Sequence, residues 1–165
     1  GDVYKRQLQY ERGAEAGAAG GLSFVRIIVD DMIDQLSDVN RNGKPALQDP
    51  LIRDELVKLV MEEKAIAIGH RRQAITPLTT DYPHSLPLSD TLRSTEYARR
   101  MRKFAVNAQG AAGSLYVGDN DARQGGFWQR AYFNSFSATI GGGTSQVQRN
   151  IVAEHILGLP KSGEK

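Results

Sequence analysis

The sequence predicts an all-α protein, an antiparallel up-and-down bundle of long helices with one added helix at the C-terminal end. Apolar residues recur at spacings of three and four over several long segments, which is the pattern of helices with one buried face. Clusters of glycine, proline and asparagine separate these segments, as expected of loops between helices. Patterns typical of β-strands are scarce.

The first helix is expected from about Leu8 to just before residues 40–45, which form a cluster of helix breakers. Five apolar residues of this segment fall on one helical face. They are Leu22, Val25, Val29, Met32 and Leu36.

The second helix is expected to begin after Asp49, because an N-cap aspartate followed by proline, here Pro50, marks a helix start. It should run to about Ala74. Its apolar face contains Ile52, Leu56, Leu59 and Val60.

Three prolines between Thr76 and Pro87 predict a loop, and a third helix is expected from about Ser89 to Gln109. Its inward positions are Leu92, Met101, Phe104 and Ala108. Residues 110–113, rich in glycine, should stop this helix, and the aromatic segment 127–137 should form the next one.

The final helix has the clearest predicted ends. Ser145 followed by Gln148 matches a capping box, while Gly158 and Pro160 suit a helix C-terminus. The expected buried face consists of Val147, Ile151, Val152 and Ile156.

Composition narrows the functional classes. The 165 residues suffice for one domain, and a formal net charge of +2 gives no reason to expect nucleic acid as a partner. No apolar run approaches the roughly 18 residues of a membrane span. There is no cysteine, and the three histidines are scattered, so neither a disulfide nor a metal site is expected. A cytoplasmic setting is compatible with these features.

Residues 1–7 have no periodicity that joins them to the following segment, and they resemble a translated sequencing adapter. We therefore expect them to be foreign to the fold and the natural protein to continue upstream of Leu8. Residues 8–165 remain as the domain.

Residues 142–160, Gly-Gly-Thr-Ser-Gln-Val-Gln-Arg-Asn-Ile-Val-Ala-Glu-His-Ile-Leu-Gly-Leu-Pro, closely resemble the C-terminal signature of acyl-CoA dehydrogenases. Residues 11–14, Glu-Arg-Gly-Ala, match the opening of the first helix in the C-terminal domain of that family. The resemblance covers roughly residues 8–161. It implies the C-terminal helical domain of such an enzyme, without the N-terminal helical and middle β-domains.

The resemblance also implies an activity. Acyl-CoA dehydrogenases hold FAD and an acyl-CoA substrate, and they oxidise the Cα–Cβ bond, a reaction used in fatty-acid β-oxidation. A glutamate removes the α-proton while the β-hydrogen leaves as hydride to the flavin. Electrons then pass to an electron-transferring flavoprotein. The enzymes are oligomers, so we expect a dimer or tetramer, and the isolated fragment should be inactive.

The catalytic glutamate of many relatives stands at the position of Gly142, which has no side chain. A second branch of the family places it on the first helix of this domain, where Glu11 matches. Glu11 is therefore the candidate base, although a carboxylate near a helix N-terminus also has a purely structural explanation. Arg12 matches a substrate-pocket residue, and the backbone N–H of Gly142 matches a donor to the thioester oxygen.

The cofactor contacts follow from the same resemblance. Thr144 and Gln146 match residues that contact the FAD phosphates and ribose, and Gly141 and Gly143 permit close approach of the flavin. Gly110 matches a loop that touches the FAD of a neighbouring subunit, and Asn107, close to that loop, is a further cofactor-binding candidate.

The sequence departs from the family in the region of that loop and after the first helix. Asn107 replaces the usual glutamine, and the Arg-x-x-Phe-Gly motif that reaches a neighbouring FAD is missing after the first helix. This departure raises the possibility of a hetero-oligomer in which only some flavin sites form.

Two other functions remain open from the sequence. An acyl-CoA oxidase would pass the flavin electrons to oxygen, and a non-catalytic family member would serve as a partner subunit in a hetero-oligomer. Gly142 and the missing Arg-x-x-Phe-Gly motif favour the partner subunit, whereas Glu11 argues against it.

Overall fold

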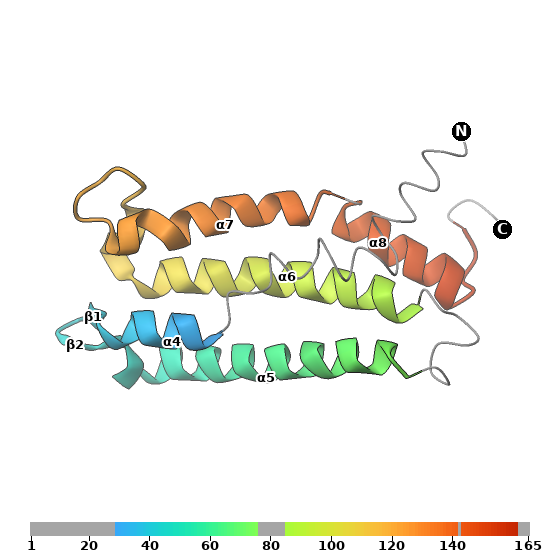
Figure 1. The fold of residues 1–165 in the computed structure, drawn as a ribbon, viewed down its shortest axis with the longest axis horizontal. Coiled ribbons are helices and arrows are strands. Elements are labelled where there is room, and N and C mark those ends of the chain that lie inside the picture. Colours follow the sequence, from blue (N-terminus) through green and yellow to red (C-terminus); the bar gives the residue numbers. More distant parts are fainter. Residues whose placement is uncertain (1–28, 76–84, 142, 162–165) are drawn as a thin grey trace.

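A computed structural model describes residues 29–75, 85–141 and 143–161 of the chain. The described helices are α4 (Val29–Ser37), α5 (Pro50–Gln73), α6 (Ser85–Ala108), α7 (Phe127–Ala138) and α8 (Ser145–Ile151). α6 runs through the middle of the bundle, with α4 and α5 on one side and α7 and α8 on the other (Figure 1). The predicted all-α bundle with an added C-terminal helix is confirmed.

The inward face of α4 agrees with its helical spacing. Val29, Met32 and Leu36 are fully buried in the hydrophobic core, and the helix ends at Ser37, before the predicted breakers. Leu22 and Val25, which belong to the same predicted face, lie outside the described residues.

The breakers at residues 40–45 form a short β-hairpin rather than an irregular loop. Strand β1 (Asn40–Arg41) pairs antiparallel with β2 (Lys44–Pro45). Asn42 and Gly43 connect them with φ values of +52° and +75°. Asn-Gly is the preferred pair for a two-residue hairpin turn because both positions need positive φ. The sequence therefore carried a hairpin signal that the helical prediction overlooked.

The predicted start of α5 is confirmed at atomic detail. Asp49 is the N-cap, and its Oδ1 accepts a hydrogen bond of 2.9 Å from the backbone N–H of Leu51. Pro50 occupies the first helical position. A residue there donates no hydrogen bond within the helix, so the missing N–H of proline costs nothing. Ile52, Leu56 and Leu59 are buried as expected.

Helix α6 begins at Ser85, so the prediction of a loop extending to Pro87 was wrong. Pro87 is the third residue of the helix. The first-turn N–H groups of any helix lack intrahelical acceptors, and a proline there removes no backbone hydrogen bond. Met101 and Ala108 are buried as predicted, and Leu92 and Phe104 are half-buried.

Tyr97 lies in the centre of the core with 1% of its surface exposed, and its hydroxyl has no hydrogen-bond partner in the described ranges. Burial raises the pKa of Tyr97, and the nearby carboxylates of Glu63 and Glu62 raise it further. The folded chain therefore holds the phenol proton at a pH at which the unfolded chain releases it.

We expect the free energy of unfolding to fall as pH rises above about 10, the ordinary pKa of tyrosine, because only the unfolded state then ionises readily. Tyr97→Phe should flatten this alkaline decline. Urea unfolding of the variant and the wild type at several pH values measures it. Tyr116→Phe, at an exposed tyrosine, is the matched control; an equal effect of both substitutions would contradict the prediction.

The N-cap of α8 is Thr144, so the prediction of a capping box at Ser145 was wrong by one residue. Thr144 has extended backbone angles, and its Oγ1 accepts a hydrogen bond of 3.3 Å from the N–H of Val147. Val147 is exposed, whereas Gln148, about 100° further round the helix, is buried. The predicted stop is confirmed, since Gly158 has φ +65° just past the helical segment.

Thr144→Ala should lower the free energy of unfolding by about 1 kcal/mol, because it removes the acceptor that caps α8. Ser145→Ala should change it by much less, since Ser145 is already helical. Chemical denaturation of both variants tests the assignment. If Ser145→Ala lowered the free energy of unfolding more than Thr144→Ala, Ser145 would be the N-cap instead.

Candidate functional site

The residues predicted to act as the base and to bind the substrate lie outside the described residues. These are Glu11, Arg12 and Gly142. Their roles therefore stay predictions. The cofactor-binding candidates Gly141, Gly143, Thr144, Gln146, Asn107 and Gly110 are all described.

The glycine-rich segment between α7 and α8 holds three of these candidates, and a fourth, Gln146, lies in the first turn of α8. The N–H of Gly141 donates to the carbonyl of Ser137 at 2.8 Å, and that of Gly143 donates to Ile140 at 3.1 Å. Gly143 has φ +115°, a conformation that side chains with a β-carbon rarely adopt. Thr144 and Gln146 are exposed where α8 begins. The exposed side chains of Thr144 and Gln146 can therefore contact a ligand, whereas the N–H groups of Gly141 and Gly143 are paired within the turn.

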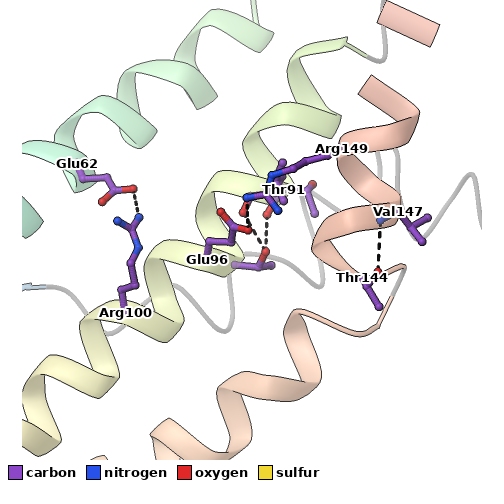
Figure 2. A network of polar contacts seen from close by, with 9 residues as sticks. Glu62, Thr91, Glu96, Arg100, Thr144, Val147 and Arg149 are labelled. Atoms are coloured by element: carbon purple, nitrogen blue, oxygen red, sulfur yellow. Dashed lines mark hydrogen bonds and ion pairs between the residues drawn. The ribbon is translucent and has the colours of Figure 1, made fainter. Parts of the chain in front are cut away.

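Two ion pairs attach α6 to its neighbours. Arg149 of α8 contacts Glu96 of α6 at 2.6 Å, and Arg100, one turn further along α6, contacts Glu62 of α5 (Figure 2). Both arginine side chains are more than half exposed, so each pair adds little stability by itself. The Arg149 pair nevertheless joins α8, which begins just after Thr144, to the middle of α6.

Gly110 lies just past the C-terminal end of α6, in a hollow of about 370 Å³ between the β1–β2 hairpin and the loop after α6. Arg41 and Arg123 also line it, and none of its lining residues is acidic. Arg123 donates a hydrogen bond of 2.7 Å to the carbonyl of Asp38, in the short segment between α4 and the hairpin. The hollow is therefore a positively charged recess.

Sequence reasoning missed both arginines of this hollow. The Asn-Gly pair could have placed Arg41 in a hairpin, but Arg123 is 82 positions later in the chain, and no local pattern connects the two. Only the packing of the hairpin against the end of α6 brings them together.

A buried amide network holds the Gly110 loop in place. The side chain of Gln109 donates to Ala105 O at 3.2 Å and accepts from Gln129 Nε2 of α7 at 3.3 Å. Gly113 packs so closely that a β-carbon would lie 2.4 Å from Val106 O. The loop backbone is therefore fixed on one side by α7 and on the other by α6.

Asn107 does not join Gly110. It lines a separate hollow of about 410 Å³ between α5 and α6, together with charged side chains that include Glu55, Lys58 and Lys103. The predicted cofactor residues thus divide among three places. Glu96, which anchors α8, and Ala108, at the end of α6, are about 18 Å apart along the helix. The Thr144 turn therefore lies beside the middle of α6, where α8 begins, and the Gly110 hollow lies at the C-terminal end of α6 (Figure 1).

Within the described ranges, no helix is long and apolar enough to cross a membrane. No group of three or more histidine or carboxylate side chains that could hold a metal ion is found in this part of the chain either.

Solved structures share this fold. The steroid ACAD Tcur3481-Tcur3483 matches with a TM-score of 0.75 at 24% identity, over 98% of this chain and 40% of that chain. The ChsE4-ChsE5 complex from Mycobacterium tuberculosis matches with a TM-score of 0.72 at 20% identity, over 98% and 41%. The fold is thus that of the helical bundle found in these proteins.

Sequence comparison then shows the family. Residues 2–157 match the model described as "Acyl-CoA dehydrogenase, C-terminal domain". The acyl-CoA dehydrogenase IpdE1 of Mycolicibacterium smegmatis is 36% identical over 117 residues, and its counterpart in Mycobacterium tuberculosis is 30% identical over 122 residues. These matches cover 70% and 72% of this chain. The chain belongs to the acyl-CoA dehydrogenase family and matches its C-terminal domain.

The chain matches 27% and 29% of the lengths of these two curated relatives. The family match begins at residue 2, within the segment that the sequence predicts to be foreign, and that segment lies outside the described residues.

Proposed function

We propose that this chain is the C-terminal part of an FAD-dependent acyl-CoA dehydrogenase that introduces an α,β double bond into an acyl-CoA thioester. The observation that supports this most is the start of α8, where Gly143 has a positive φ and Thr144 is the N-cap, in a chain of this family. The position of the base and the binding of the flavin are both part of the proposal.

The described residues fit the chemistry of FAD, which carries a doubly charged pyrophosphate. Arg41 and Arg123 give the Gly110 hollow a positive charge without a competing acid, and Gly110 leaves its rim free of a β-carbon. Thr144 and Gln146 offer polar groups at the beginning of α8. Since the two sets of groups lie at separate places along α6, one beside its middle and one at its C-terminal end, we propose that they serve flavins of two neighbouring subunits.

FAD, when bound, supplies the acceptor for the β-hydrogen that leaves as hydride. Glu11 removes the α-proton with its carboxylate, and Arg12 orients the substrate. The backbone N–H of Gly142 donates to the thioester oxygen, where negative charge grows as the proton leaves. A backbone donor does not need a side chain, so glycine at this position preserves oxyanion stabilisation.

The names of the relatives suggest which substrates and partners to test. Tcur3481-Tcur3483 is named a steroid ACAD, and ChsE4-ChsE5 is named a complex. We propose that the enzyme assembles with a further subunit, of its own or a paralogous chain, and passes electrons to an electron-transferring flavoprotein.

The test is reduction of bound flavin in the complete enzyme, expressed with and without an adjacent paralogue. Bound FAD is first quantified by its absorbance. Loss of the flavin absorbance is then followed anaerobically with straight-chain, branched and steroid-derived acyl-CoA thioesters. Reduction by at least one of them supports the dehydrogenase, and a preparation that binds FAD without being reduced by any of them contradicts it.

The same assay distinguishes the dehydrogenase from an acyl-CoA oxidase and from a non-catalytic partner subunit. Rapid reoxidation of the reduced flavin by air would identify an acyl-CoA oxidase. A chain that binds no FAD alone but is required for reduction of the flavin in its paralogue would be a non-catalytic partner subunit. Gly142, in place of the usual glutamate, favours this last alternative.

A further inference from the structure

The β1–β2 hairpin carries a chemically reactive pair of residues at its tip. Asn42 is the one asparagine of the chain that is followed by glycine. Asn42 and Gly43 are both exposed, and a β-carbon built on Gly43 would meet no described atom within 4 Å beyond its chain neighbours. Because glycine has no side chain, nothing shields its backbone nitrogen from the side chain of the preceding residue. Asparagine is a thermolabile residue, and this position leaves it unprotected.

The side chain of Asn42 and the backbone of Gly43 can react with each other without an enzyme. The nitrogen of Gly43, after losing its proton, attacks Cγ of Asn42, and the amide Nδ2 leaves as ammonia. The new N–Cγ bond closes a succinimide ring. Water then opens the ring at either of its carbonyls, which gives aspartate or isoaspartate. The balance is one water consumed and one ammonia released, without any oxidation or reduction, and a neutral amide becomes a carboxylate.

The fold allows this reaction because the hairpin is short. Ring closure requires rotation about the Cα–C bond of Asn42, which moves the residue out of its place in the turn. Strands β1 and β2 have only two residues each, and so small a hairpin opens readily. Below the strands, the N–H of Ala46 donates to the carbonyl of Val39 at 2.7 Å. The tip can therefore open while the base of the hairpin stays in place.

The carboxylate forms within the positively charged hollow described above. Asn42 lines the Gly110 hollow together with Arg41 and Arg123, and none of the lining residues is acidic. Deamidation therefore introduces a negative charge beside the two arginines. Isoaspartate also adds a carbon to the backbone of a two-residue turn, which disturbs the pairing of Arg41 with Lys44. Both products reduce the attraction of the hollow for an anion.

We propose that Asn42 is a site of spontaneous deamidation, and that the modified chain binds anions in the Gly110 hollow less tightly than the newly synthesised chain. The first part concerns the covalent chemistry of the hairpin and is independent of the flavin. The second part rests on the proposed function, in which this hollow holds the pyrophosphate of FAD. The two parts are measured separately, with inorganic pyrophosphate as the probe for the second.

Peptide mapping by mass spectrometry tests the modification site in the 165-residue chain, after incubation at mildly alkaline pH. The peptide that contains Asn42 should gain about 1 Da as its NH₂ group is exchanged for OH. Asn120 is the internal control, because it is exposed but precedes an aspartate. Asn42 should convert about tenfold faster than Asn120, since only Asn42 precedes a residue without a side chain.

Calorimetric titration with inorganic pyrophosphate tests the effect on the hollow, with Asn42→Asp as the defined product. This substitution should weaken pyrophosphate binding about threefold to tenfold at low ionic strength, because the new carboxylate repels the anion. Asn120→Asp is the matched control, since it makes the same charge change on an exposed loop that does not line the hollow. It should bind pyrophosphate like the wild type.

A third variant connects the two measurements. Asn42→Gly removes the reactive amide and keeps the hairpin, because glycine suits the positive φ of the turn. Incubation should lower the pyrophosphate affinity of the wild type and leave that of Asn42→Gly unchanged.

Each contrary result overturns a stated part of the proposal. Conversion of Asn42 no faster than that of Asn120 would overturn the modification site. Equal pyrophosphate affinities of wild type and Asn42→Asp would overturn the effect on the hollow. A wild-type chain that binds no pyrophosphate would overturn this effect together with the anion-binding role of the hollow, while the mass spectra still decide the modification site. Flavin reduction in the complete enzyme decides the dehydrogenase activity independently of all three.

Discussion

Glu11→Gln should slow reduction of the bound flavin by acyl-CoA by about 100-fold to 10,000-fold, the usual contribution of a general base. Glutamine keeps the size of the side chain but cannot take up the α-proton. Gly142 has no side chain to replace it, because it occupies the position at which many relatives carry their glutamate. FAD should remain bound, since the arginines and the polar turn that we propose to hold it are unchanged.

The rate is measured by stopped-flow loss of flavin absorbance in the complete enzyme, with bound FAD quantified in each preparation. Glu15→Gln is the matched control, because Glu15 lies one predicted helical turn away and undergoes the same change. Equal rates for wild type and Glu11→Gln would assign the base to another residue. An equal loss in both variants would indicate a general effect on the helix.

Trp128→Ala should lower the free energy of unfolding by about 3–5 kcal/mol, the range for truncating a buried aromatic residue. Trp128 has 1% of its surface exposed and is the largest fully buried side chain among the described residues. It belongs to the hydrophobic core and contacts Phe127 edge-on at 5.3 Å between ring centroids. Its removal leaves a cavity between α7 and the rest of the core.

Urea unfolding of wild type and variants measures this loss, and two comparisons explain its origin. Trp128→Phe should cost much less, because it keeps an aromatic ring and removes an indole N–H that has no partner in the described ranges. Phe133→Ala, at an aromatic residue that is 59% exposed, should cost well under half as much as Trp128→Ala. A similar cost for Phe133→Ala would contradict the assignment of Trp128 to the central core.

The helices and their buried faces could be predicted from the sequence because they depend on local periodicity. Val29, Met32 and Leu36 of α4, and the Asp49-Pro50 start of α5, illustrate this. The errors arose where two local signals competed. Thr144 and Ser145 are both good N-caps, and sequence spacing alone favoured the second, whereas the backbone takes its extended conformation at the first.

The residues of the candidate site also differ in whether the sequence could predict them. The turn at Thr144 lies within one contiguous motif, so a resemblance over nineteen residues could identify it. The charged hollow depends on Arg41 and Arg123, which meet through tertiary packing alone. Asn107 and Gly110, three residues apart, were expected to act together, but the end of α6 and the change of direction at Gly110 place them on different hollows.

The helical segment after α8 has a consequence for reading related sequences. Residues Val152–Ile156 form a π-helical turn, in which the N–H of Leu157 bonds to the carbonyl of Val152. Such a turn accommodates one more residue than an α-helical turn, so its effect resembles a one-residue insertion. Side chains beyond it are displaced by about 100° from the pattern before it. A single helical wheel drawn over residues 145–157 therefore misplaces the residues of this wider turn.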